Sequence, residues 1–154
     1  MIVERLPEHL HEDAVSLWEE AGLTRPWNDP RADLDRALAG PTSTVLAAVE
    51  EGRLAGTAMV GHDGHRGWVY YVAVHPSRRG QGLGRELMVA AEGWVAGRGI
   101  PKMQLMVRST NTGTREFYER MGYAVQDTVV LGKFFDPERQ ARQSGPARLS
   151  GGDR

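Results

Sequence analysis

The chain has 154 residues, and its 19 basic and 20 acidic side chains give a formal net charge of −1 at pH 7. A charge this close to zero creates no general attraction to nucleic acid or to an anionic membrane, so neither is expected as a partner. The chain contains no cysteine, which excludes a disulfide framework and any covalent intermediate on a cysteine thiolate.

The length is typical of one domain, and the content of 40% hydrophobic and 25% charged residues is ordinary for a globular protein. No apolar run approaches the roughly 18 to 20 residues of a membrane-spanning helix. The first residues also lack the basic stretch and apolar core of a signal peptide. We therefore expect a cytoplasmic protein.

Hydrophobic periodicity and turn residues predict an alternating order of elements. In the first half these are a strand (2–6), two helices (9–21 and 31–38) and three antiparallel strands (43–49, 54–60 and 68–74). In the second half they are a helix (83–96), a strand (102–107), a helix (111–121) and a strand (123–131).

The last residues differ from the rest in composition. Residues 137–154 contain proline, serine and glycine breakers, four arginines against two acidic residues, and no aromatic side chain. Such a segment buries too little apolar surface to offset the entropy of ordering it. We expect one domain over residues 1–135 and a flexible basic tail over residues 136–154, with a basic contact for a partner as the alternative.

The most informative stretch covers residues 72–86 and reads V-A-V-H-P-S-R-R-G-Q-G-L-G-R-E. Glycines alternate at positions 80, 82 and 84 behind Arg78 and Arg79, between a predicted strand and a predicted helix. Glycines let the backbone turn sharply and bring its N–H groups close to a ligand, and the first turn of the helix adds unpaired N–H groups and a partial positive charge. The stretch therefore predicts a cradle for the phosphates of a small molecule.

The spacing of this loop excludes two common nucleotide motifs. In a dinucleotide-binding loop a third glycine would stand where this chain has Arg85, and an acidic residue would follow the next strand where it has Arg108. No Lys-Ser/Thr pair follows the glycines, as a Walker A loop requires. A nicotinamide-dependent oxidoreductase is therefore a disfavoured alternative.

What remains is Arg79-x-x-Gly82-x-Gly84 preceded by Val74-x-Pro76, which resembles the acyl-CoA-binding signature of the GNAT family of N-acetyltransferases. Residues 111–123, N-T-G-T-R-E-F-Y-E-R-M-G-Y, resemble the second signature of the same family. Asn111 is a good N-cap for a helix here, and Gly122 stands where a glycine ends one.

The resemblance implies the GNAT fold, an α/β (α+β) architecture with a central, mixed, mostly antiparallel twisted sheet flanked by helices in the order β-α-α-β-β-β-α-β-α-β. It assigns Tyr118 a catalytic role at the sulfur of acetyl-CoA, where the phenol can donate to the departing thiolate. It also places the thioester carbonyl at a strand bulge around Val72 and Ala73. The cofactor-binding residues that it implies are Val72, Ala73, Val74, Arg79, Gly80, Gln81, Gly82, Leu83, Gly84, Arg85, Asn111 and Tyr118.

Further segments look like the YpeA subgroup of bacterial GNAT proteins, over about residues 1–135. They are residues 23–30 (L-T-R-P-W-N-D-P), 56–57 (G-T), 63–67 (D-G-H-R-G), 70–71 (Y-Y) and 131–133 (L-G-K). These segments indicate kinship and do not identify a substrate.

The acceptor side is less well defined. The candidates are Arg25, Trp27, Asn28, Asp29, Tyr70 and Tyr71. Period-2 alternation predicts that Tyr70 and Tyr71 point to opposite faces of the sheet, so that only one of them reaches the acceptor cleft. His62 and His65 flank a hairpin turn without a second group of metal ligands, so we expect no metal.

An alkylamine has a pKa of about 10.4 and must lose a proton before it attacks a thioester. Many relatives carry a glutamate on the strand before the Val-x-Pro motif, and this chain has no carboxylate there. A base at Glu19, Glu20, Asp29 or Asp63, a water chain, or an acceptor of low pKa all remain open.

The sequence as a whole predicts an acyltransferase that moves an acetyl group from acetyl-CoA to a primary amine by direct attack in a ternary complex. The amine is expected on a small molecule or a peptide, and a homodimer is compatible with this. A GNAT-like module that binds acyl-CoA without turnover is the alternative, favoured by the missing carboxylate.

Overall fold

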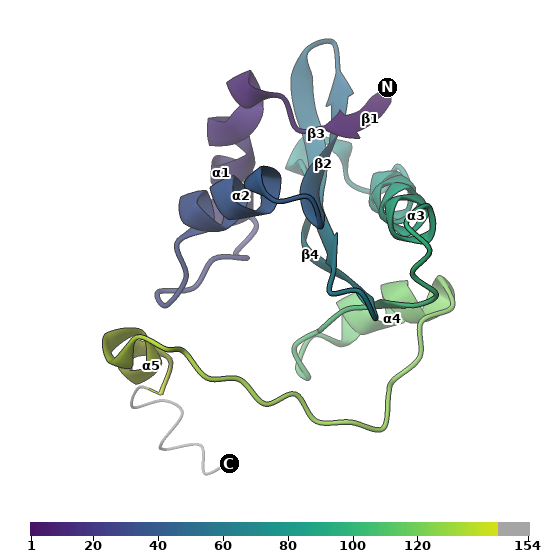
Figure 1. The fold of residues 1–154 in the computed structure, drawn as a ribbon. Coiled ribbons are helices and arrows are strands. Elements are labelled where there is room, and N and C mark those ends of the chain that lie inside the picture. The colour runs from purple at the N-terminus through teal and green to yellow at the C-terminus, as the bar shows by residue number, and fades with distance from the viewer. Residues whose placement is uncertain (145–154) are drawn as a thin grey trace.

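The computed structural model describes residues 1–144 of the chain. A five-stranded sheet with the order β1-β2-β3-β4-β5 lies at the centre, with α1 and α2 on one face and α3 and α4 on the other (Figure 1). The strands are β1 (Ile2–Arg5), β2 (Ser43–Glu50), β3 (Arg53–His62), β4 (Gly67–Val74) and β5 (Met103–Gln104). The helices are η1 (Glu8–Leu10), α1 (His11–Glu20), α2 (Pro30–Ala39), η2 (Pro76–Arg78), α3 (Leu83–Ala96), α4 (Thr112–Arg120) and α5 (Pro137–Gln143).

The sheet is mixed. Strands β1 to β4 pair antiparallel in chain order, and β5 pairs parallel with β4 through Gly67–Met103 and Trp68–Gln104. A parallel pair requires a crossover connection, and α3 supplies it. The predicted mixed, mostly antiparallel sheet with helices on both faces is confirmed.

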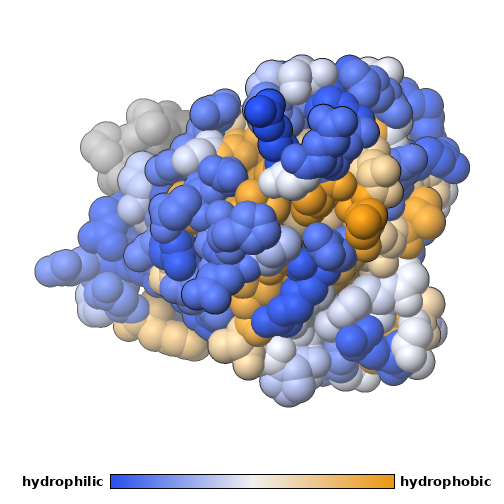
Figure 2. Space-filling model, turned by 90° about the horizontal axis from the view of Figure 1, so that it is seen from above, coloured by the Kyte–Doolittle hydropathy of each residue, from blue (hydrophilic) through white to orange (hydrophobic). Residues whose placement is uncertain are grey.

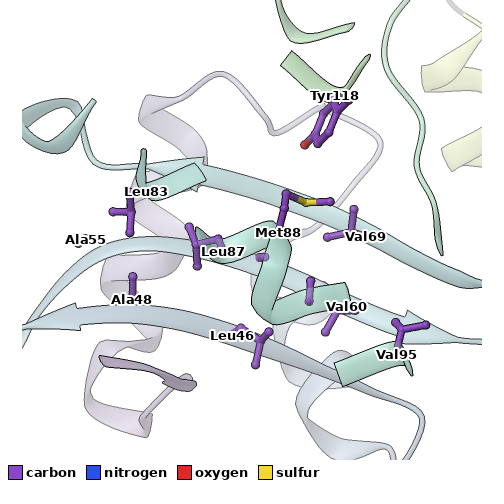
Figure 3. Close-up of a cluster of buried hydrophobic side chains, with 12 residues drawn as sticks. Leu46, Ala48, Ala55, Val60, Val69, Leu83, Leu87, Met88, Val95 and Tyr118 are labelled. Carbon is purple, nitrogen blue, oxygen red and sulfur yellow. The ribbon is translucent and has the colours of Figure 1, made fainter. Parts of the chain in front are cut away.

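Two hydrophobic clusters cover the two faces of the sheet. On one face, Leu83, Leu87 and Met88 of α3 pack against β2, β3 and β4, and Tyr118 lies at the edge of this cluster (Figure 3). On the other face, Trp18 and Leu34 of the first two helices pack against the sheet. Because β2 is covered on both faces, five consecutive residues of it are buried.

The two helices of the signature segments begin and end where the sequence predicted. Helix α3 follows Gly82, and the Asn111 side chain caps α4 by accepting a hydrogen bond from the Thr114 N–H at 3.2 Å. Gly122 follows α4 with a φ of 96°, a conformation that favours glycine. Local signals were sufficient here because a cap and an apolar face are both encoded within one helix.

The last predicted strand, at residues 123–131, is not formed, and the predicted strand at 102–107 is reduced to the two residues of β5. The predicted order therefore lacks its final strand. The residues have the β-branched composition of a strand, but no neighbouring strand pairs with them within residues 1–144. A strand needs a partner for its backbone groups, which composition alone does not provide.

The predicted flexible tail also begins later than expected, because Pro137–Gln143 forms α5. Asp136 caps this helix by accepting from the Glu138 N–H at 3.0 Å, and Pro137 occupies its first turn, where a missing N–H costs nothing. The Arg139 Nε donates to the Trp27 carbonyl at 2.5 Å, which docks α5 near the loop between α1 and α2. The rest of the predicted tail, residues 145–154, lies outside the described residues.

Seen from above, the surface is mostly hydrophilic, with hydrophobic side chains gathered in one zone between polar ones (Figure 2). Over the described residues, no helix combines the length and the apolar character needed to cross a membrane.

Candidate active site

Strand β4 contains a bulge at Tyr71 and Val72. Met59 of β3 pairs with Tyr70 and Thr57 pairs with Ala73, so two residues of β4 lie opposite the single residue between Thr57 and Met59. Tyr71 has a φ of +50°, a left-handed conformation that costs a non-glycine residue about 1 kcal/mol or more. The resemblance had placed the bulge around Val72 and Ala73, and the structure places it one residue earlier.

The bulge is held in place by a buried threonine. The Thr57 hydroxyl accepts a hydrogen bond from the Trp18 indole at 2.8 Å and donates one to the Tyr71 carbonyl at 2.9 Å. The Trp18 ring stacks on the Tyr71 ring with centroids 4.0 Å apart. Because Trp18 and Thr57 are both fully buried, these contacts exclude water and offset the strain at Tyr71.

The bulge changes which way the neighbouring side chains point. Val69 and Val72 pack in the cluster under α3, whereas Tyr71 packs in the cluster under α1 and α2. Tyr70 and Tyr71 therefore lie on the same face, and both line one cleft. The prediction that only one of the two tyrosines reaches the cleft is wrong, because the extra residue of the bulge interrupts the alternation.

This cleft, of about 610 Å³, lies between α2 and strands β3 and β4. Of the other acceptor candidates, Asn28 also lines it. Arg25 instead donates to the carbonyls of Gly22 and Thr24, each at 2.8 Å, within its own loop. The remaining two do not line the cleft: Asp29 caps α2 through the Arg31 and Ala32 N–H groups, and the Trp27 carbonyl binds Arg139.

Asp33 is a cleft residue that the sequence reasoning missed. Its Oδ2 accepts from the Tyr71 hydroxyl at 2.8 Å, and its Oδ1 accepts from the Arg36 guanidinium at 3.1 Å. Burial, together with this hydrogen bond to Asp33, raises the pKa of Tyr71. The available signal was weak: Asp33 precedes the buried Leu34 on α2, which places it at the border of the apolar face.

Asp63, proposed as a base, also lines the cleft but has a structural task in the hairpin turn. Its Oδ1 accepts from the His65 N–H at 2.9 Å and from the Arg66 N–H at 2.7 Å. These backbone hydrogen bonds lower the pKa of the Asp63 carboxyl. Glu19 and Glu20, two further candidates, are exposed and lie outside the cleft lining.

Strands β4 and β5 pair at two positions, Gly67–Met103 and Trp68–Gln104, and no further pairing between them is found within residues 1–144. In the part of the chain that the structure describes, no strand pairs with the edge of residues 70–74 that faces β5. An unpaired strand edge offers N–H and C=O groups to an extended ligand. The bulge lies within this open edge.

Tyr118 of α4 lies in the same cluster as Val72 and Val74 of this edge, and its hydroxyl end turns toward the cluster (Figure 3). Its ring makes edge contacts with Phe117 and Tyr123, at centroid distances of 5.0 and 5.8 Å. Burial raises the pKa of Tyr118 to about 12. Tyr118 is therefore a protonated donor at neutral pH.

The glycine loop follows β4 and leads into α3. Gly80 and Gly82 have φ values of +76° and +79°, and a Cβ added to either would have no heavy atom within 4 Å. Glycine at these two positions therefore allows the left-handed backbone conformation, and the space beside each of them is open. Gly84 has another role, since its Cβ would lie 3.4 Å from the Phe117 ring of α4. Leu83, between them, is buried in the core below the loop.

The two arginines before the glycines differ. Arg78 pairs with Glu50 and donates to the Gln81 side chain at 2.9 Å, so it fastens the loop to the end of β2. Arg79 and Arg85 are exposed and form no ion pair with any described residue. They are the cations available to an anionic ligand at this loop.

Comparisons with known proteins agree with this geometry. The sequence model described as the acetyltransferase (GNAT) family matches residues 8–123. The chain is 43% identical over 122 residues to an acetyltransferase of Yersinia pestis, covering 79% of this chain and 86% of that protein.

Two solved structures have the same fold. The aminoglycoside acetyltransferase AAC(6')-Iy, in complex with the bisubstrate analogue CoA-S-monomethyl-acetylneamine, matches with a TM-score of 0.72 at 18% identity, over 86% of this chain and 97% of that chain. A transcriptional regulator from Bacillus halodurans matches with a TM-score of 0.75 at 18% identity, over 86% and 99%. The structural likeness supports the fold, and the family model and the 43% identity establish more: the chain belongs to the GNAT family of acetyltransferases.

Proposed function

We propose that this chain is an acetyl-CoA-dependent N-acetyltransferase that moves the acetyl group to a primary amine by direct attack in a ternary complex. The observation that carries the proposal is the bulge at Tyr71 and Val72, which joins a cleft on one face of the sheet to an open strand edge on the other. The CoA-derived ligand of AAC(6')-Iy supports an acyl-CoA as the donor.

The residues of the loop and strand fit such a donor. The open space beside Gly80 and Gly82 admits a diphosphate to the backbone N–H groups at the start of α3, and Arg79 adds a charge. Gln81, Gly84, Arg85 and Asn111 complete the set of donor-binding residues that the family signatures imply. The unpaired edge of residues 72–74 offers backbone groups to the chain that links the phosphates to the thioester.

The donor supplies an activated acetyl group, and residues of the chain stabilise the negative charges that develop on the oxyanion and on the departing thiolate. A backbone N–H at the bulge that is aimed at the developing oxyanion contributes about 3 kcal/mol. Tyr118 has a pKa of about 12, whereas an ordinary thiol has a pKa of about 8.5, so complete proton transfer from the phenol to the departing thiolate is uphill. Tyr118 therefore stabilises the thiolate by donating a hydrogen bond.

On the acceptor side, Asp33 is our candidate for orienting the amine. Asp33 lies beside the bulge through its hydrogen bond to Tyr71, and each of its carboxylate oxygens has a second lone pair. Asp29 and Asp63 already accept two backbone N–H groups each. A cationic amine held by Asp33 would lie next to Tyr70 and Tyr71, within reach of the bulge.

The identity of the amine and the subgroup belong to the same proposal. The acceptor is a small molecule or peptide whose amine enters the cleft beside Asn28. The YpeA-like segments at residues 23–30 and 131–133 support kinship with that subgroup, and residues 1–135 form the acetyltransferase unit. The missing carboxylate on β4 favours a non-catalytic acyl-CoA-binding module, and turnover on a panel of amines distinguishes this alternative.

The phosphate anchor is tested with Gly82→Asp. We expect the affinity for CoA to fall about a hundredfold or more, because the new carboxylate enters the space of the diphosphate. The matched control is Gly99→Asp, since Gly99 has the same φ of +79° and the same open surroundings at the far end of α3. Calorimetric titration with CoA measures both, and an unchanged affinity in Gly82→Asp contradicts the placement.

A second prediction concerns charge. Arg79→Ala should weaken CoA binding about three- to tenfold at low ionic strength and less at high ionic strength, because salt screens an exposed pair. Arg98→Ala, at the other end of α3, is the control and should leave the affinity unchanged. A loss of equal size at both salt concentrations assigns Arg79 to packing of the loop.

For the thiolate, the test is Tyr118→Phe. A donor that acts only as the C–S bond breaks should lower kcat by about ten- to a hundredfold and leave the Kd of acetyl-CoA unchanged. Tyr123→Phe is the control, because it removes a neighbouring hydroxyl that donates to Glu92 at 2.5 Å. Steady-state kinetics with an accepted amine measure both variants, and an unchanged kcat in Tyr118→Phe removes this residue from the mechanism.

The acceptor side is tested with Asp33→Asn, which keeps an oxygen for the Tyr71 hydroxyl but removes the charge. We expect the KM of the amine to rise about tenfold or more, with the Kd of acetyl-CoA unchanged. Asp35→Asn on the same helix is the control, since Asp35 pairs with Arg31 at the surface. An unaltered KM in Asp33→Asn excludes an interaction of Asp33 with the amine.

A further inference from the structure

The acceptor cleft carries an ion pair on its helical wall. Asp33 and Arg36, three residues apart on α2, both line the cleft, and the Asp33 Oδ1 lies 3.1 Å from a guanidinium nitrogen of Arg36. The exposed fraction is 21% for the Asp33 side chain and 66% for the Arg36 side chain. The negative charge is therefore the inner one, beside Tyr71, and the positive charge lies nearer to solvent.

Both charged groups can bind a ligand in addition to each other. The Asp33 carboxylate accepts from Tyr71 at one oxygen and from Arg36 at the other, and each oxygen has a second lone pair. The Arg36 guanidinium has five N–H donors, and its bond to Asp33 uses one of them. A guanidinium binds a carboxylate well because its planar fork forms two parallel hydrogen bonds. A ligand with an ammonium group next to a carboxylate would therefore match this pair.

The same pair disfavours an acceptor with several positive charges. A polycation is attracted to a surface of one sign, whereas here Arg36 would repel a second ammonium group beside the one that Asp33 holds. Asp63, the other carboxylate of the cleft, belongs to the hairpin turn and already accepts from the N–H groups of His65 and Arg66. The charges on α2 thus favour a zwitterion over a polyamine.

An apolar surface on β3 and β4 forms another part of the cleft. Trp68 and Tyr70, two residues apart on β4, line the cleft together with Met59, which pairs with Tyr70 across the two strands. Tyr70 is 44% exposed, so a large part of its side chain is free to contact a ligand. Aromatic rings and the methionine sulfur pack well against an aromatic group. The cleft volume of about 610 Å³ lies in the range of small-molecule sites.

We propose, on the basis of the N-acetyltransferase activity proposed above, that the acceptor is an α-amino acid with an aromatic side chain. Asp33 binds its ammonium group, Arg36 binds its carboxylate, and its side chain packs on the surface formed by Met59, Trp68 and Tyr70. The C–N bond forms at the α-nitrogen as the C–S bond of the thioester breaks. Of the two protons that the ammonium group loses, one goes to solvent before the attack and one ends on the thiol of CoA.

The first test compares four acceptors. L-phenylalanine is the probe, phenethylamine lacks its carboxylate, L-alanine lacks its ring, and spermidine is a polycation. We expect kcat/KM for L-phenylalanine to exceed that of each other amine about tenfold or more. Release of the CoA thiol measures turnover without background from the protein, because the chain has no cysteine. An equal or higher value for any of the other three overturns the acceptor class and leaves the N-acetyltransferase activity standing.

Binding separates this inference from the proposed function. In calorimetric titrations of the CoA-bound protein, we expect L-phenylalanine to bind about tenfold or more tightly than phenethylamine. Such binding without turnover of any amine rejects the N-acetyltransferase activity and retains the ligand class. No binding of L-phenylalanine overturns the ligand class.

Arg36→Gln tests the carboxylate contact. The Kd of L-phenylalanine should rise about tenfold, and the Kd of phenethylamine should not rise, because only the amino acid has a carboxylate. Arg36→Lys should recover part of the loss, since it restores the charge without the fork. Arg31→Gln is the control on the same helix, because Arg31 pairs with Glu12 and Asp35 outside the cleft. An equal rise for both ligands assigns Arg36 to the folding of α2 and overturns the contact.

Tyr70→Ala tests the surface for the side chain. We expect kcat/KM to fall about tenfold for L-phenylalanine and to stay within about twofold for L-alanine, which has no ring to pack there. Val89→Ala is the control, because Val89 is 54% exposed on α3, and it should change neither value. Equal losses for the two amino acids overturn the placement of the aromatic side chain on Tyr70.

Discussion

The structure depends on one buried hydroxyl group, that of Thr57. It holds the Tyr71 carbonyl and the Trp18 indole together, and so joins β3, β4 and α1 at the bulge. Without this bulge, β4 would continue as a regular strand and direct Tyr70 and Tyr71 to opposite faces. With it, both tyrosines line the cleft, while Val72 faces the other side of the sheet. The strain at Tyr71 is therefore balanced by its contacts with Trp18 and Thr57, both of which are fully buried.

Features encoded within a short segment could be predicted from the sequence. Helix α3 was predicted with its correct bounds because Gly82 precedes an apolar face that repeats over several turns. The cap at Asn111 and the glycine end at Gly122 were read from single residues for the same reason. The mixed sheet was expected from the resemblance to the GNAT family, whose order of elements the predicted order matches.

Features that depend on distant residues could not be predicted. The position of the bulge is set by Thr57 and Trp18, which lie far from Tyr71 in the sequence. Asp33 reaches the cleft only because α2 packs beside the bulge, 38 residues away from its partner Tyr71 in the chain. Residues 123–131 have the composition of a strand, but composition does not say whether a partner strand is present. Likewise, Gly80, Gly82 and Gly84 are evenly spaced, and this spacing does not reveal that only Gly84 of the three packs against the Phe117 ring.

The two faces of the sheet divide the proposed reaction between them. The cluster under α1 and α2 carries the cleft with Asp33, and the cluster under α3 and α4 carries Tyr118 and the loop. The bulge lies between the two faces, because Tyr71 packs in the cluster under α1 and α2 and Val72 in the cluster under α3. The proposed direct attack fits this division, because an amine in the cleft and a thioester at the open edge would meet at the bulge without a nucleophile from the protein. Because burial raises the pKa of Tyr118 to about 12, the phenol is protonated at neutral pH, and in the proposed mechanism it donates to the departing thiolate while the amine loses its proton on the opposite face.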